Sequence, residues 1–464
     1  MALARGYTGK KSSNIVPIVI SLAVVGAIGY GVSLYSFESE DPTIKSSHNK
    51  YWNRVSPITI DIADNEDLES YEISVSDGQK EVITNAETFI KPTKKKTISF
   101  VYPQQPINGV LLNQEATKIE VKIKAKDKSK WNFLMGNSAS LELALTVDTI
   151  PPEATVLTHS YSITKGGSAL VIFQAKDDNM RDLYIEANGN KFYPQPYKKA
   201  GYYATLIAWQ HNKPDFKATL VAKDEASNQK EIMIDFYPIA RDYRVSWIEA
   251  TDKFIDGKIS ELASSETSLR NRTERLDKLK AVNETLRDGN EALIHNASKA
   301  VSKDILQSWS ITPFYPLVNG QKVADFGDDR HYYYKDKTKE VAHSLHVGID
   351  LASNQNAPIV ASNGGKVVMD KLNGIYGNMP MIDHGLGLYT LYGHCSSIAV
   401  KNGDIVKKGD IIAKSGMTGL ALGDHLHFGV LVQGVEVRPE EWMDQHWLND
   451  NVYKVFTQAD GVIR

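Results

Sequence analysis

The chain is poor in cysteine and in net charge, and both shortages exclude something. Cys395 is its single cysteine, so an intramolecular disulfide is impossible and cysteine usage reveals no oxidising compartment. The formal net charge at pH 7 is only -3, which indicates neither nucleic-acid binding nor a general affinity for membrane surfaces. The sequence also lacks a His-Glu-x-x-His motif, so it offers no glutamate base of that type.

Charge is missing altogether from one N-terminal stretch. Ile15 to Leu34 carries no charged residue and is long enough to cross a hydrocarbon core of about 30 Å as a helix. Basic residues precede this run and acidic residues follow it: Arg5, Lys10 and Lys11, then Glu38, Glu40 and Asp41. The positive-inside rule therefore predicts a cytoplasmic tail at 1–14 and a single-pass anchor of the inner membrane at 15–35, with the rest periplasmic or extracellular. A cleaved signal peptide is the rival interpretation, but its small-x-small site at 27–29 lies inside the apolar run.

At 464 residues the chain is too long for one core, and two β-rich regions follow the predicted anchor. Apolar and charged residues alternate strictly over 118–125, which predicts a half-buried strand. Pro151 and Pro152 mark a joint, and the triplet Ala-Lys-Asp recurs at 125–127, 175–177 and 222–224. We predict two immunoglobulin-like β-sandwich modules, at 36–149 and 150–243, which are candidate surfaces for protein partners.

The hydrophobic period then changes to that of a helix. Leucines recur at three- and seven-residue spacings among charged residues, at positions 269, 276, 279, 286 and 293. We predict a helical segment at 244–311, broken into a pair at Gly289 and Asn290. From 312 to 464 short apolar runs alternate with glycines, Asp and Asn, which predicts a compact antiparallel sheet. The fold class is therefore mainly β and multidomain.

Histidines gather near the C-terminus in a pattern that suits a metal. In the segment Gly423 to Gly429 we expect a strand, on which His425 and His427 face the same way. With His346 and Asp350, His427 completes two imidazoles and one carboxylate, a set that suits zinc with its fourth position open. Zinc would generate hydroxide near neutral pH. His394 and His425 remain to move the proton and to stabilise an oxyanion.

These residues stand in motifs that resemble the lysostaphin/LytM-type zinc peptidases, which cut cell-wall peptides. The resemblance covers about 312–445 and includes His346-Val-Gly-Ile-Asp350, Leu391-Tyr-Gly-His394, Ser415-Gly-Met-Thr-Gly419 and Gly423-Asp-His-Leu-His-Phe428. It implies one zinc ion held by His346, Asp350 and His427, with His394 and His425 as catalytic histidines. It also implies a groove that admits an extended peptide.

Together these features predict a membrane-anchored zinc endopeptidase that hydrolyses peptide bonds of peptidoglycan. The alternative is a non-catalytic scaffold of the same type that activates another wall hydrolase. The helical segment at 244–311 is then either a linker or a cover over the catalytic groove.

Other polar residues of this region receive structural interpretations. We expect an ordinary structural role for His384, an exposed side chain for His343, an ion pair for Arg330 and a turn for Asp424. Cys395 neighbours His394 in a strand and should face away from it, which argues against a thiol nucleophile.

Overall fold

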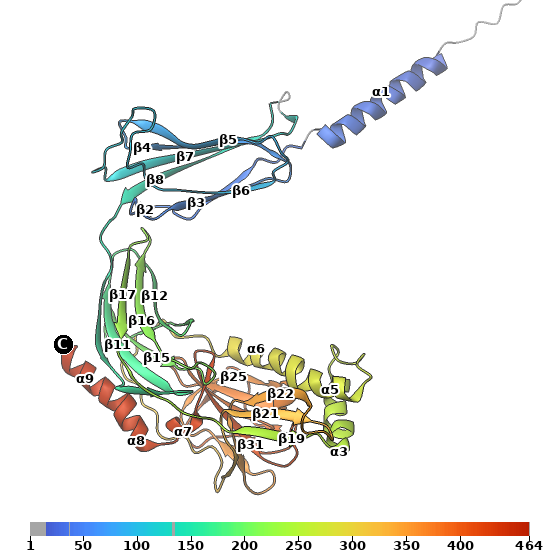
Figure 1. Ribbon diagram of the computed structural model, residues 1–464, viewed down its shortest axis with the longest axis vertical. Coiled ribbons are helices and arrows are strands. Elements are labelled where there is room, and N and C mark those ends of the chain that lie inside the picture. The colour runs from blue at the N-terminus through green and yellow to red at the C-terminus, as the bar shows by residue number, and fades with distance from the viewer. Residues whose placement is uncertain (1–14, 37, 132–134, 464) are drawn as a thin grey trace, which may run out of the picture. The chain divides into compact units, whose positions relative to one another are not determined.

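The computed structural model describes residues 15–36, 38–131 and 135–463. The tail predicted at 1–14 lies outside these residues. The chain divides into two compact units, one formed by Met1–Ile150 with Glu225–Asn228 and the other by Pro151–Asp224 with Gln229–Arg464 (Figure 1). Each unit is described by itself below.

The first unit contains helix α1 (Ile15–Ser36) and a set of strands. The strands are β1 (Thr43–Ser46), β2 (Tyr51–Trp52), β3 (Ile58–Ala63), β4 (Leu68–Ser76), β5 (Glu81–Thr88), β6 (Lys95–Phe100), β7 (Lys118–Asp127) and β8 (Ser138–Val147). Within the described residues, no helix is both long and apolar enough to cross a membrane. The structure therefore does not support the anchor at 15–35, which stays a prediction from the sequence.

The strands of the first unit form two sheets around one core. The sheet β1-β3-β6 and the sheet β2-β8-β7-β4-β5 both contribute buried side chains to it. Ile119, Val121 and Ile123 of β7 are at most 1% exposed, whereas Glu120 and Lys122 between them are exposed and half-buried, respectively. The alternation predicted for this strand is thus confirmed, and the region is a two-layered sandwich.

The second unit begins with another pair of sheets, in the orders β14-β15-β11-β9 and β13-β12-β16-β17. Their strands are β9 (Glu153–His159), β11 (Ser168–Lys176), β12 (Met180–Ala187), β13 (Asn190–Phe192), β14 (Gln195–Pro196), β15 (Tyr202–Ala208), β16 (Ala218–Asp224) and β17 (Gln229–Ile234). A two-stranded parallel sheet joins β10 (Ser162–Thr164) to β18 (Tyr237–Ile239). Strand β11 is buried along almost its whole length, as a continuous apolar run requires.

A helical segment follows, as the leucine spacing predicts. Its helices are α3 (Asp252–Phe254), α4 (Ser260–Ser265), α5 (Arg275–Ala281) and α6 (Arg287–Ala297), with π-helical turns at Ile255–Ile259 and Val282–Leu286. The predicted break at Gly289 and Asn290 is wrong, because α6 runs through both residues. One glycine costs a helix only about 1 kcal/mol, and the Asn290 side chain is buried against a neighbouring loop.

The C-terminal region is an antiparallel sheet in the order β20-β23-β31-β27-β26-β25-β29, with β32 paired to β31. Its strands are β20 (Gln321–Ala324), β23 (Ile349–Ala352), β25 (Gly365–Leu372), β26 (Asn378–Asp383), β27 (Leu388–Gly393), β29 (Ile405–Val406), β31 (Leu426–Val432) and β32 (Val435–Val437). Two small sheets flank it: β24 (Pro358–Val360), β30 (Ile411–Lys414) and β28 (Ser397–Ile398), and then β19 (Val245–Glu249), β21 (Asp328–Tyr333) and β22 (Glu340–His346). The chain ends in α7 (Pro439–Trp442), α8 (Gln445–Leu448), a π-helical turn (Asn449–Tyr453) and α9 (Lys454–Val462).

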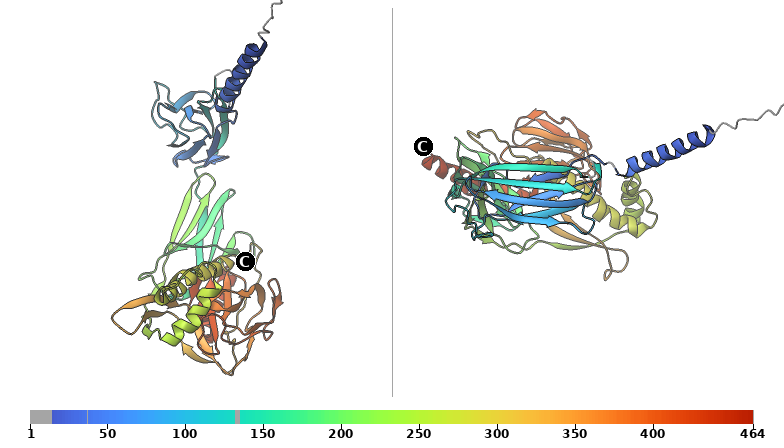
Figure 2. Two further views of the ribbon diagram at one scale, coloured as in Figure 1. Left: turned by 90° about the vertical axis from the view of Figure 1, so that its right-hand side faces the viewer. Right: turned by 90° about the horizontal axis from the view of Figure 1, so that it is seen from above.

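Two hydrophobic cores hold the second unit together. One runs without interruption from the sheets of residues 153–234 into the C-terminal sheet and its terminal helices. The other lies between the helical segment and the opposite face of the C-terminal sheet, where Leu279, Val282 and Ile294 meet Met379 and Leu391 (Figures 1 and 2; Figure 2 shows α6 along the sheet). The C-terminal sheet is therefore covered on both faces.

Candidate active site

The three predicted metal ligands come from three different strands. His346 ends β22, Asp350 lies in β23 and His427 lies in β31, where it is the cross-strand partner of Asp350. Gly348 makes the close approach possible, because a Cβ at this position would lie 2.6 Å from Cε1 and Nε2 of the His427 ring.

Their donor atoms converge on a small triangle. His346 Nε2, Asp350 Oδ1 and His427 Nδ1 lie 3.0 Å from one another along each edge. His346 and His427 are about 5% exposed, and Asp350 is partly buried. Residues 81 positions apart in the chain thus meet at one point.

The chemistry of this triangle fits a cation. His346 Nδ1 lies 2.8 Å from the Asp325 carbonyl oxygen, which can only accept, so the hydrogen is on Nδ1 and Nε2 presents a bare lone pair. The triangle therefore contains at most one hydrogen, on His427 Nδ1, while the imidazoles are neutral. A divalent ion satisfies all three donors at once.

The protonation states are those that metal binding requires. Burial opposes the charge on Asp350, but the facing imidazoles of His346 and His427 outweigh it and hold the pKa of that carboxyl well below its usual range. Burial also lowers the pKa of His427 to about 4. At neutral pH Asp350 is thus a carboxylate and His427 a neutral imidazole, the forms in which these groups bind a metal.

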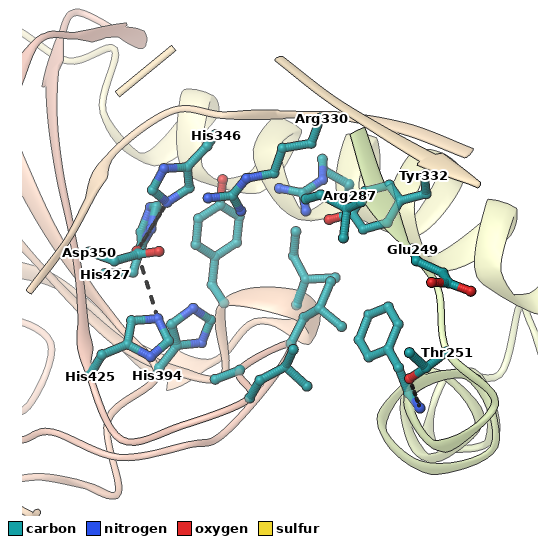
Figure 3. Close-up of a pocket in the computed structure, with 17 residues that line it drawn as sticks. Glu249, Thr251, Arg287, Arg330, Tyr332, His346, Asp350, His394, His425 and His427 are labelled. Atoms are coloured by element: carbon teal, nitrogen blue, oxygen red, sulfur yellow. Dashed lines mark hydrogen bonds and ion pairs between the residues drawn. The ribbon is translucent and has the colours of Figure 1, made fainter. Parts of the chain in front are cut away.

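The two remaining predicted histidines stand beside the triangle (Figure 3). His394 Nδ1 donates to the Thr418 carbonyl and His425 Nδ1 donates to the Gly423 carbonyl, each at 2.8 Å, so both rings present a bare Nε2. Their ring centroids are 4.7 Å apart, and His425 Nε2 lies 3.7 Å from Asp350 Oδ1. The lone pair of each Nε2 can take up a proton or accept a hydrogen bond.

Backbone geometry holds these histidines in place. His394 directly follows β27 with φ +63°, a left-handed conformation that is strained for a residue with a side chain. Burial, with the neighbouring His425 and His427, lowers the pKa of His394 to about 3, so its ring stays neutral. His425 lies one residue before β31 begins, just outside the strand that the sequence predicts for it.

A cavity of about 380 Å³ opens in front of the five residues. Its lining joins them to residues of the preceding segment, of β21 and of two loops: Ile248, Glu249, Thr251, Phe254, Arg287, Arg330, Tyr332, Ile375, Tyr376, Leu420, Ala421 and Leu422. The segment predicted as linker or cover at 244–311 therefore forms part of one cavity wall.

Helix α6 also holds a loop of the site. Asn290 Oδ1 accepts a hydrogen bond from the Ile375 amide at 2.9 Å, and Asn373 Nδ2 donates to the Asn290 carbonyl at 3.1 Å. The next loop residue, Tyr376, donates its hydroxyl hydrogen to Glu291 Oε1 at 3.3 Å. The helical segment thereby fixes the loop at residues 373–377.

Tyr376 is a site residue that the sequence interpretation missed. Its ring centroid lies 5.4 Å from that of His427 in an edge-to-face contact, and its carbonyl accepts the His394 amide at 2.7 Å. Glycines at 374 and 377 bracket it, and those turn residues are the signal that could have marked it.

His384 and Cys395 are structural residues, as expected, although His394 and Cys395 lie just after β27 and not in a strand as the sequence interpretation assumed. His384 is buried and bonded to the Gly364 carbonyl and to Thr390 Oγ1, and burial lowers its pKa to about 4. Cys395 is buried, which raises the pKa of its thiol to about 12 and makes it a poor nucleophile. Asp424 lies in a bend just before β31 and accepts hydrogen bonds from Ser415 Oγ and the Asn356 amide, so it ties this bend to two other segments.

A second group of potential ligands lies on the hairpin of β21 and β22. Asp329, His331 and His343 offer ligand atoms within 4.8 Å of one another. His343 pairs with Asp329, and His331 Nδ1 lies 2.7 Å from Glu340 Oε2. The His343 side chain is 46% exposed, as predicted. These groups are paired among themselves on the surface, in contrast to the buried triangle.

A buried triangle of two imidazoles and one carboxylate, with two bare imidazole nitrogens beside it, is an arrangement typical of metal-dependent hydrolases. Residues 344–439 match the model of peptidase family M23. The C-terminal domain is thus an M23 peptidase domain of the lysostaphin/LytM type, which confirms the resemblance seen in the sequence.

The chain is also similar in sequence to characterised proteins, over stretches of about the length of this domain. The chain is 40% identical over 95 residues to the DD-carboxypeptidase/endopeptidase Mpg of Neisseria meningitidis, which covers 20% of this chain and 22% of the relative. It is 41% identical over 88 residues to the peptidoglycan DD-endopeptidase ShyB of Vibrio cholerae, covering 19% and 21%. The match thus spans about a fifth of these relatives' length.

Among solved structures, the catalytic domain of lysostaphin from Staphylococcus simulans is similar. It is 29% identical and covers 27% of this chain and 93% of that domain, with a TM-score of 0.23.

Proposed function

We propose that this protein is a zinc endopeptidase that hydrolyses peptide bonds of peptidoglycan. The observation that carries the proposal is the convergence of His346, Asp350 and His427 at 3.0 Å, with the bare Nε2 atoms of His394 and His425 beside it. The peptidoglycan substrate follows from relatives named as DD-endopeptidases.

The chain's own residues would divide the work as follows. His346, Asp350 and His427 would hold one zinc ion, which when bound supplies Lewis-acid polarisation of the carbonyl and acidifies water. His394 and His425 would take the proton of the attacking water at a bare Nε2, and the ring that holds this proton could then donate it in a hydrogen bond to the developing oxyanion. The Thr418 and Gly423 carbonyls keep the other ring nitrogens protonated, so those tautomers are fixed.

Digestion of purified sacculi by the full chain tests the proposal. Mass spectrometry of the released muropeptides should show cleaved stem peptides or cross-links, and a chelator should abolish release until zinc is restored. His346→Ala should be inactive. His343→Ala is the matched control, because this histidine lies three residues away in the same strand and is exposed. Equal release by wild type and His346→Ala would overturn the proposal.

An experiment in cells distinguishes the non-catalytic scaffold from the enzyme. A scaffold should keep its phenotype when His427→Ala removes a ligand, whereas an enzyme should lose it. All five residues of the site are present and assembled, and this supports the enzyme.

We further propose single-pass anchoring with the N-terminus in the cytoplasm and the bulk outside. The support is the uncharged run at 15–34 with basic residues before it and acidic residues after it. Because Cys395 is buried, cysteines introduced at Lys10 and at Lys45 would be the accessible thiols. A membrane-impermeant maleimide should label position 45 and spare position 10 in intact spheroplasts, and the reverse pattern would contradict the orientation.

A further inference from the structure

Two arginines reach into the cavity beside the metal triangle (Figure 3). Arg330 comes from β21, and Arg287 is the first residue of α6. Their side chains are only 20% and 13% exposed. Figure 3 shows both guanidinium groups between His346 and Tyr332, across the cavity from His394 and His425. Among the described residues, no hydrogen bond or ion pair joins either arginine to the metal triangle, so the site described above gives them no role.

Each arginine is anchored through its Nε, and Arg287 Nη1 also forms an ion pair with Glu291 Oε1 at 3.7 Å. Arg330 donates from Nε to Asp328 Oδ2 at 3.0 Å, which confirms the ion pair expected for it, and Arg287 donates from Nε to the Asn283 carbonyl at 3.2 Å. The terminal nitrogens of both donate no hydrogen bond within the described part of the chain, and the nearest acid to those of Arg287 is Glu291, at 3.7 Å. Two guanidinium groups are thus oriented in advance, with N–H donors facing open space.

The acids next to the two arginines do not fully neutralise them, so this part of the cavity can bind an anion. Asp328 offsets Arg330, and it also accepts from Ser246 Oγ. Burial raises the pKa of Glu291 to about 7, so this acid only partly offsets Arg287 at neutral pH. Two acids belong to the cavity lining itself: Asp350, which is part of the metal triangle, and Glu249, which is exposed at the end of β19.

Guanidinium groups with free terminal N–H donors match a carboxylate, which they bind through paired hydrogen bonds. Nearby apolar lining suits a short side chain rather than a sugar: Ile248, Phe254, Ile375, Leu420 and Leu422. We propose that Arg287 and Arg330 form a subsite for a carboxylate of the peptide substrate, beside the bond that is cut. This inference rests on the proposed function and names the substrate class as a peptide with a free carboxylate near the scissile bond.

The test compares one substrate in two forms. Cross-linked muropeptide dimers are purified, and half of the sample is converted to carboxamides. The full zinc-loaded chain should show a kcat/KM at least tenfold higher for the carboxylate form, since a charge-assisted hydrogen bond contributes roughly 1.5–3 kcal/mol. In Arg287→Gln, Arg330→Gln and the double variant this preference should fall toward one.

Two variants serve as controls. Arg275→Gln removes an arginine of the same helical segment that pairs with Asp252 and Asp256 outside the cavity, and Glu249→Gln changes a cavity residue of the opposite charge. Both should keep the carboxylate preference. Because the readout is a ratio of two substrates on one protein, a loss of folded protein does not move it.

Three results overturn the subsite. They are equal cleavage of both forms by wild type, a preference that survives in the double variant, and a preference lost equally in Arg275→Gln. If wild type cleaves neither form, the proposed function fails, and calorimetric binding of the dimers decides the subsite. Tighter binding of the carboxylate form that the double variant loses upholds it, and equal or absent binding of both forms refutes it.

Discussion

Replacement of Asn290 by alanine tests whether the helical segment is part of the active site. The Asn290 side chain is 7% exposed and its Oδ1 is the acceptor for the buried Ile375 amide. Alanine leaves that donor without a partner, which costs about 1–3 kcal/mol. The loop at 373–377 should therefore open roughly 5- to 150-fold more often.

Hydrogen exchange followed by mass spectrometry measures this directly. Peptides that span 373–377 should exchange faster by that factor, while peptides from β11 should not change. Hydrolysis should fall roughly ten- to a hundredfold, because the same loop carries Tyr376 against His427 and small misplacements near a reacting centre are costly. Asn296→Ala is the matched control, since Asn296 is exposed on the same helix and bonds only to Lys299.

Equal exchange and equal activity in the Asn290→Ala and Asn296→Ala proteins would refute the reasoning. Faster hydrolysis in Asn290→Ala would instead favour a cover that restrains the enzyme.

Three further predictions concern the metal triangle and the buried acid of α7. Gly348→Ala places a Cβ 2.6 Å from the His427 ring; we expect a loss of about 1–3 kcal/mol of stability from overpacking and zinc bound well below one equivalent by elemental analysis, with full occupancy as the contrary result. His346→Ala should likewise lose bound zinc, whereas His343→Ala should keep it. The opposite result would indicate that the metal binds at the surface hairpin of β21 and β22 instead. Glu441, whose Oε2 accepts the Ser168 amide at 3.0 Å, has its pKa raised to about 7 by burial. The contribution of the protonated Glu441 to stability is full below the ordinary carboxyl pKa and is lost as the pH rises through about 7. The free energy of unfolding, measured with denaturant, should therefore fall less between pH 5 and 8 for Glu441→Gln than for wild type or Glu440→Gln.

The sequence predicts the metal triangle because its residues carry chemistry in recognisable motifs. His346, Asp350 and His427 are of ligand types, and His394 and His425 stand in neighbouring motifs of the same resemblance. The alternation of apolar and charged residues over 118–125 likewise predicts β7, because a strand with one solvent-exposed face has apolar residues at every second position.

What the sequence does not predict is tertiary. Tyr376, Arg287 and Asn290 belong to no ligand motif, and their roles come from the packing of α6 on the loop at 373–377. The wrong helix break at Gly289 and Asn290 has the same origin. Asn290 looks like a helix breaker by local propensity, but its side chain finds a partner only in the folded protein.

The uninterrupted core of the second unit determines where the chain can be shortened without opening that core. A chain that starts at residue 312 would lose Ser168, whose amide and hydroxyl bond Glu441 and Trp442, and Tyr197, whose hydroxyl bonds Asp460. It would also lack β19, the strand that pairs with β21, and would expose the apolar side of the terminal helices to water. The smallest piece that keeps this core closed begins near Pro151, so the β-rich region before the helices travels with the peptidase as one folding unit.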